Sequence, residues 1–244
     1  MVLVHGGTAD RGRWAPVLAG LAERYGVHAV DRRGRGLSTA EVGPYNIRRE
    51  GEDIAAVTEA VGRDVYVVAH SYGALCALES ALLTDAIGRM VLYEPPLPTG
   101  DRHVVAPDVL DRLRTATAAG HPEEVLKTFF REVIRLGPDE IEAMRTTPIW
   151  GARLAAAPTI VRELEAVGCF EVSDRLARIE IPVRLLLGTR SPAYFAPAAE
   201  AIAARLPQAD VLPLHGQDHM GIDRDPEQFI TAVLNFASSA GRQG

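Results

Sequence analysis

The sequence predicts an α/β domain: a mostly parallel central sheet flanked by helices, with a helical insertion. Short apolar runs alternate with helically spaced segments over residues 1–96 and again over residues 180–244. Such alternation is typical of right-handed crossover units and a parallel sheet. Residues 107–169 show helical spacing and no convincing strand. We therefore expect a core domain of residues 1–96 and 180–244, and an insertion of residues 97–179.

Six apolar runs are expected to form the strands of this sheet, and most are stopped by glycine, proline or acidic residues. They are Val2 to His5, Val27 to Val30, Val65 to Ala69, Met90 to Tyr93, Val183 to Leu187 and Val211 to Leu214. Helical spacing marks residues 12–24, the segment around Ile54, Val57 and Val61, and residues 73–84. Two further helices are expected near Pro197 and from Asp225-Pro226 onwards, where aspartate and proline resemble an N-cap and a first turn.

The composition and charge argue against several classes of protein. The chain of 244 residues carries a net charge of −6, without a basic block, which argues against nucleic-acid binding. The sequence contains no run of 18 apolar residues and therefore predicts no membrane span. Residues 1–7 are typical of a buried strand rather than a signal peptide. Cys76 and Cys169 suggest core-filling thiols in a reducing compartment, with one disulfide as the alternative, and we expect a cytoplasmic protein. No metal or cofactor signature is present, and monomer and homodimer both stay open.

Ser71 lies in a short motif, Ala69 to Gly73, between an apolar strand and a helix rich in Ala and Leu. A serine that projects above a sheet edge needs a very sharp turn, and Ala69 and Gly73 are small enough to allow one. A helix beginning directly after Ser71 also directs backbone N–H groups at negative charge forming there. The motif is close to Gly-x-Ser-x-Gly and predicts Ser71 as a nucleophile. An ordinary strand-to-helix turn that contains a serine is the alternative.

With these features the chain resembles the α/β-hydrolase family over nearly all its length. The resemblance rests on His5-Gly6-Gly7 after the first strand, the polar loop Asp31 to Ser38, the turn at Ser71, and His219 after the last strand. The insertion after Glu94 lies where that family carries its lid or cap. The family usually has two strands before its His-Gly strand. We therefore expect a sheet that lacks these two and has about six strands.

The resemblance implies that His219 is the base that removes the proton of Ser71, because free serine is a weak nucleophile. His219 follows the last strand, which suits the chain order of nucleophile, acid and base. His215 is the less favoured alternative. His70 is expected to be structural, with its side chain directed away from Ser71. The resemblance also implies the N–H groups of Gly7 and Tyr72 as the oxyanion donors.

The acid is harder to place, because Leu187 to Pro192, where the family most often has it, contains no carboxylate. The remaining acids before His219 are poorly placed: Glu200, Asp210 and Asp218. The family has a second acid position, which Glu94 occupies, two strands from the usual one and held by the two prolines that follow. We expect Glu94 to complete a triad with Ser71 and His219. A solvated or cap-pairing carboxylate is the alternative.

Aromatic and apolar side chains should give an apolar pocket for an uncharged, moderately large acyl or ring-bearing substrate. The expected pocket residues are Trp14, Phe129, Phe130, Trp150 and Met220. Three arginines offer a second hypothesis, in which they receive a carboxylate, although surface arginines are usually solvated: Arg13, Arg102 and Arg190.

The leading functional hypothesis is hydrolysis of an ester, lactone or thioester through an acyl-Ser71 intermediate. A carbon–carbon bond hydrolase shares a serine triad and helical cap, and a non-hydrolytic lyase or cyclase would use the cap to exclude water. A ligand-binding protein with an inactive triad is the third class. The missing acid after Gly188 favours these alternatives.

Overall fold

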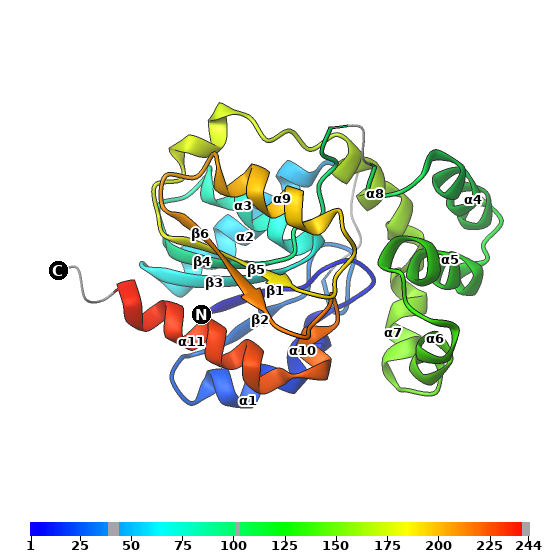
Figure 1. Ribbon diagram of the computed structural model, residues 1–244, viewed down its shortest axis with the longest axis horizontal. Helices are drawn as coiled ribbons and strands as arrows, with labels where there is room; N and C mark the ends of the chain where they lie inside the picture. The colour runs from blue at the N-terminus through cyan, green and yellow to red at the C-terminus, as the bar shows by residue number, and fades with distance from the viewer. Residues whose placement is uncertain (39–43, 101–102, 241–244) are drawn as a thin grey trace.

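Six parallel strands form one sheet in the computed structural model, which describes residues 1–38, 44–100 and 103–240 (Figure 1). The strands are β1 Val2–Val4, β2 His28–Val30, β3 Val65–His70, β4 Ile87–Tyr93, β5 Val183–Gly188 and β6 Ala209–Leu214. Their order across the sheet is β2-β1-β3-β4-β5-β6, and every pair is parallel. The predicted fold class and the expected number of strands are confirmed.

Helices cover both faces of the sheet (Figure 1). One face carries α2 Ile47–Val61, α3 Tyr72–Ala81 and α9 Phe195–Ala203. The other carries η1 Arg11–Trp14, α1 Ala15–Ala22, α10 Gly221–Arg224 and α11 Pro226–Ala240. Strand β3 explains why two helical layers are needed. Val67 and Ala69 belong to the core under the first layer, while Tyr66 and Val68 belong to the core under the second, so both faces of the strand are apolar.

Between β4 and β5 the structure describes a series of helices and no strand longer than a single bridge residue, Thr99; these helices are called here the insertion helices. They are α4 Pro107–Ala118, α5 Pro122–Thr128, η2 Phe129–Ile134, α6 Pro138–Arg145, α7 Ile149–Ala156, η3 Ala157–Thr159, α8 Ile160–Gly168 and η4 Asp174–Arg178. Figure 1 shows α4 to α7 standing to one side of the sheet. Leu113, Leu126, Phe130 and Ile160 belong to a separate apolar core within this group. That residues 97–179 form an insertion separate from the core domain remains a prediction.

The register of the strands brings their carboxyl ends to one edge of the sheet. Val4 pairs with Ala69, Ala69 pairs with Leu92, and Leu92 pairs with Leu185. Loops that follow these strands therefore emerge next to one another, as is usual for sites in open parallel sheets. All the predicted catalytic residues lie in such loops.

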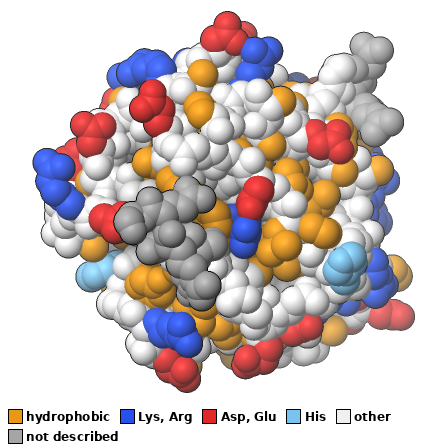
Figure 2. Space-filling view, turned by 60° about the vertical axis from the view of Figure 1, so that its left-hand side comes forward, with side chains coloured by type: hydrophobic (Ala, Val, Ile, Leu, Met, Phe, Trp, Pro, Cys, Tyr) orange, Lys and Arg blue, Asp and Glu red, His pale blue; other side chains and the backbone are white. Residues whose placement is uncertain are grey.

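The surface carries charges of both signs. On the face drawn in Figure 2, outside the grey atoms, acidic and basic side chains are interspersed. No helix of the described part of the chain is long and apolar enough to cross a membrane. Cys76 is buried, as predicted, whereas Cys169, the residue after α8, is exposed, so the prediction of a core-filling thiol is wrong for Cys169.

Candidate active site

Ser71 occupies a strained turn between β3 and α3. Its backbone has φ 54° and ψ −127°, which a residue other than glycine rarely adopts. The turn is possible because two glycines let neighbouring backbone approach. A Cβ on Gly73 would lie 2.3 Å from the carbonyl oxygen of His5, and one on Gly6 would lie 2.8 Å from Cβ of Ser71. Backbone strain of this kind is typical of functional sites.

Replacing Gly73 by alanine is expected to lower the free energy of unfolding by about 3 kcal/mol, because the new methyl group must displace backbone and not a flexible side chain. Gly151 of α7 provides a matched control, since nothing lies within 4 Å of its Cβ position. Gly151→Ala should be neutral or stabilise by up to about 1 kcal/mol. Urea unfolding of both variants measures the difference. A loss below about 1 kcal/mol in Gly73→Ala would contradict the close approach.

His219 lies between Ser71 and Glu94 and has a polar contact on each ring nitrogen. Its Nε2 is 3.1 Å from Oγ of Ser71, and its Nδ1 is 2.7 Å from Oε2 of Glu94. The ring is stacked on Phe195, with centroids 4.7 Å apart and planes at 15°. The His70 ring contacts it at a tilt of 36°, with centroids 4.6 Å apart, and His70 Nε2 is 3.2 Å from the carbonyl oxygen of His219. These contacts fix the orientation of the imidazole.

Glu94 directly follows β4 and is fully enclosed by donors. Its Oε1 accepts hydrogen bonds from the backbone N–H of Gly188, at 2.8 Å, and from the hydroxyl of Ser191, while Oε2 faces His219. The side chain is 0% exposed, and the backbone again has a positive φ, 50°. The expectation that Glu94 lies two strands from the usual acid position is wrong, because β4 and β5 are neighbours. Ser191 occupies the usual acid loop and contacts the carboxylate.

The predicted oxyanion donors lie beside Ser71. Gly7 and Tyr72 both line the cavity at the Ser71 hydroxyl, and Tyr72 is the first residue of α3, so its N–H has no acceptor within the helix. His5 shapes this loop: its Nδ1–H donates to the carbonyl oxygen of Gly6, and its Nε2 accepts from the backbone N–H of Arg32. Burial lowers the pKa of His5 well below its usual value, which keeps the ring neutral.

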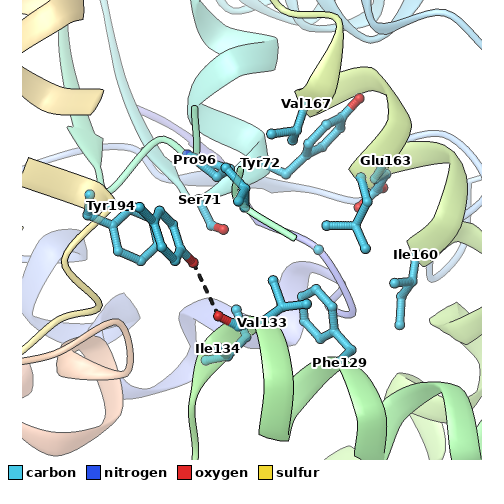
Figure 3. Close-up of a pocket in the computed structure, with 14 residues that line it drawn as sticks. Ser71, Tyr72, Pro96, Phe129, Val133, Ile134, Ile160, Glu163, Val167 and Tyr194 are labelled. Carbon is cyan, nitrogen blue, oxygen red and sulfur yellow. Dashed lines mark hydrogen bonds between the residues drawn. The ribbon is translucent and has the colours of Figure 1, made fainter. Parts of the chain in front are cut away.

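Two small cavities meet at Gly7 and Ser71, each of about 30 Å³, which is room for about two water molecules. The first is apolar, and Figure 3 shows the Ser71 hydroxyl among its walls. Phe129 and Val133 of η2 close one side, Ile160 and Val167 of α8 another. Segment η2 is a π-helix, a form that is frequent at functional sites.

The second cavity contains different side chains. His219, Met220, Phe130 and two buried arginines, Arg13 and Arg153, line it. Its lining, unlike that of the first cavity, contains no acidic residue.

The predicted pocket residues divide into two groups. Phe129 lines both cavities, and Phe130 and Met220 line the second. Trp14 and Trp150 line neither, which corrects the prediction. Trp14 is fully buried between the sheet and α11, and Trp150 packs in the core of the insertion helices, because an apolar aromatic pattern does not distinguish a core position from a cavity wall.

The arginines proposed to bind a carboxylate lie in different places. Arg13 is buried at the second cavity and paired with Asp223 at 2.6 Å. Arg190 is exposed and lines a surface depression with Asp218. Arg102 lies outside the described residues.

Sequence reasoning missed two charged residues of the insertion helices. Glu163 of α8 lines the first cavity and accepts hydrogen bonds from Arg32 and, at 2.5 Å, from Arg35, both in the loop after β2. Arg153 of α7 lines the second cavity. Each lies on the buried face of its helix, Arg153 three residues after Trp150, and Glu163 three residues after Ile160. A charge at an apolar position of the helical pattern is the signal that could have found them.

The strand order, the serine turn after β3 and the histidine after β6 together define a hydrolase of the α/β class. Comparison with known proteins gives the same result. Residues 1–232 match the alpha/beta hydrolase family, to which the chain belongs.

Three similar proteins carry the names of hydrolytic enzymes. The chain is 27% identical over 236 residues to a putative carbamate hydrolase of Caulobacter segnis, with 93% of this chain and 86% of that protein covered. It is 28% identical to an N-formylmaleamate deformylase of Pseudomonas putida, with 97% of this chain and 87% of that protein covered. A solved α/β hydrolase from Sphaerobacter thermophilus has 31% identity and a TM-score of 0.83, with 97% and 91% covered. The protein is therefore a hydrolase.

Proposed function

We propose that the protein hydrolyses an ester, lactone or thioester bond of a small molecule through an acyl-serine intermediate on Ser71. The observation that carries the proposal is the continuous chain of contacts from Glu94 through His219 to Ser71, with distances of 2.7 and 3.1 Å. Serine becomes a useful nucleophile when a base is within hydrogen-bond reach and a third group orients that base. The two distances satisfy both conditions, and Ser71 lines an apolar cavity.

The reaction proceeds in two halves. Oγ of Ser71 attacks the carbonyl carbon while its proton passes to Nε2 of His219, and the N–H groups of Gly7 and Tyr72 stabilise the oxyanion. Collapse of this intermediate breaks the bond to the leaving group, which takes the proton from His219. A water molecule, deprotonated by His219, then attacks the acyl carbon. Collapse of the second intermediate releases the carboxylic acid and returns the proton to Ser71.

The position of Glu94 bears on the competing hypotheses. A lyase, a cyclase and a binding protein with an inactive triad were favoured by the lack of an acid after Gly188. The N–H of Gly188 itself donates to Glu94, so the acid reaches the histidine from the neighbouring strand. Relatives named as a carbamate hydrolase, a deformylase and a methyl ester esterase also support hydrolysis at an acyl carbon.

Labelling with a fluorophosphonate probe tests the proposal, because such probes react with activated serines. We expect the native protein to be labelled at Ser71 and Ser71→Ala to remain unlabelled, as measured by mass spectrometry of the intact chain and its peptides. Ser80, which is buried in α3 and bonded to the carbonyl oxygen of Ala77, provides a control serine, and Ser80→Ala should still be labelled. Absence of labelling in the native protein would refute the acyl-serine mechanism.

A further inference from the structure

The two cavities at Ser71 differ in charge. The first is lined mostly by apolar side chains, and its one acid, Glu163, is bonded to Arg32 and Arg35. The second contains the guanidinium groups of Arg13 and Arg153 and has no carboxylate in its lining. The sequence predicts an uncharged substrate, and the second cavity does not fit that expectation.

Arg153 is a buried cation with neutral partners. It is 6% exposed, and its Nη1 donates to the hydroxyl of Thr8 at 2.8 Å and to the carbonyl oxygen of Thr8 at 3.4 Å. Its Nε is buried without a hydrogen-bond partner. No carboxylate of the described residues lies within 4.0 Å of its nitrogens. Burial and the nearby Arg13 lower the pKa of Arg153 to about 10, so the group still carries its charge at neutral pH.

Arg13 adds donors to this cavity and little charge. Its Nη1 is paired with Asp223, while its Nη2 is buried and has no partner. Arg153 therefore has only neutral hydrogen-bond partners, with the carboxylates of Asp223 and Asp10 beyond ion-pair distance, and Arg13 and Arg153 each have one buried N–H group without a partner. A buried charge without a partner is costly, and the cost falls when an anionic ligand supplies the missing acceptors. A single carboxylate matches this charge and the small volume of about 30 Å³ better than a dianionic phosphate.

The position of His219 indicates whether the acyl group or the leaving group of a substrate would carry the carboxylate. His219 lines the second cavity and is absent from the lining of the first, which contains both oxyanion residues, Gly7 and Tyr72. In the proposed mechanism His219 returns its proton to the leaving group. The leaving group therefore lies in the second cavity, and the acyl group in the first.

We propose that Arg153 and Arg13 form a carboxylate-binding subsite for the leaving group, so that the preferred substrates are esters of an apolar acyl group with a hydroxycarboxylic acid. This proposal rests on the function proposed above. Arg153 binds the carboxylate, and the ring of Phe130, 5.2 Å from its guanidinium carbon, helps to hold that group in place. The acyl chain occupies the cavity of Figure 3.

The test compares butyryl esters that differ only in charge. Butyryl esters of glycolate, 3-hydroxypropanoate and 4-hydroxybenzoate are each paired with the ester of the corresponding amide. Values of kcat/KM are divided by the rate of hydroxide-catalysed hydrolysis of the same ester. For at least one pair we expect a 10- to 100-fold preference for the carboxylate, the range of a hydrogen bond to a charged group. A ratio near one in all three pairs overturns the subsite.

Two variants, and a substrate that carries its carboxylate in the acyl half, test the proposal further. Arg153→Met should reduce the preference to near one, whereas Arg145→Met, which removes an exposed arginine of the same insertion helices, should leave it unchanged. 4-Nitrophenyl hydrogen succinate carries its carboxylate in the acyl half and should react more slowly than 4-nitrophenyl butyrate. The opposite order would overturn the assignment of the subsite to the leaving group. If Arg153→Met fails to fold, both substrate comparisons in the native protein still decide.

A binding measurement separates failure of the subsite from failure of the mechanism. Ser71→Ala protein is titrated in a calorimeter with each of the three hydroxy acids and its amide. At least tenfold tighter binding of one acid supports the subsite, even if no ester is hydrolysed and no serine is labelled. Equal or undetectable binding of acid and amide in every pair overturns it, even if neutral esters are good substrates.

Discussion

His219→Ala is expected to lower kcat for ester hydrolysis by about 10⁶-fold, the loss seen when the base of a serine triad is removed. The reason is geometric. Nε2 of His219 is the nitrogen that faces Oγ of Ser71, and without it the hydroxyl keeps its proton and the leaving group has no acid. Steady-state hydrolysis of a butyryl ester measures the change.

Two comparisons make this result specific. His215→Ala removes the exposed histidine four residues earlier and should retain nearly all activity. The double variant Ser71→Ala, His219→Ala should be about as slow as either single variant, because residues that act as one unit lose their effect together. Multiplied losses, or activity within tenfold of the native protein in His219→Ala, would contradict the assignment of the base.

Glu94→Gln is expected to lower kcat by about 10⁴-fold with little effect on folding. Glutamine keeps the size of the side chain, and its oxygen can still accept from the N–H of Gly188. It lacks the charge that stabilises the imidazolium of His219 and the acceptor that holds Nδ1 protonated. Kinetics of the variant, together with its circular dichroism and urea midpoint, separate the catalytic loss from unfolding.

The control for Glu94→Gln is Glu200→Gln, the same chemical change at an exposed position of α9, which should leave turnover unchanged. Asp218→Asn tests the nearest competing acid. Asp218 bonds to the backbone N–H of Met220 and to Arg224, so a modest loss is expected from it. A larger loss in Asp218→Asn than in Glu94→Gln would transfer the role of the acid to Asp218.

We expected Ser71, His219 and Glu94 to meet because each follows a strand and parallel strands end at the same edge of a sheet, while the roles of His219 and Glu94 came from the resemblance to the family. Chain order alone therefore places such residues near one another. The neighbouring order of β4 and β5 was not predicted correctly, since spacing along the chain does not give the order of strands across the sheet. The structure supplies that order, and with it the contact between Glu94 and Gly188.

The lining of the cavities was less predictable, because it depends on how the insertion helices are rotated against the core. Trp14 and Trp150 are of a residue type common in pockets, but they lie in apolar cores. Arg153 and Glu163 are of types common on surfaces, but they line cavities. Helical periodicity gives the face of a helix that is buried. Helical periodicity does not predict which residues of that face pack against another helix and which line a cavity.

The contact of Glu163 with Arg32 and Arg35 has a consequence for the evolution of this enzyme. Both arginines are buried in the loop after β2, and their carboxylate at hydrogen-bond distance comes from α8. Recombination that replaced the insertion by one from another enzyme would remove that acceptor, leaving Arg32 with Glu50 at 3.7 Å and Arg35 with the carbonyl oxygen of Ala9, and the loss of a buried ion pair is destabilising. The insertion is therefore not an interchangeable module. New specificity in this lineage is expected to arise by substitution within the existing helices, with an acid retained at position 163.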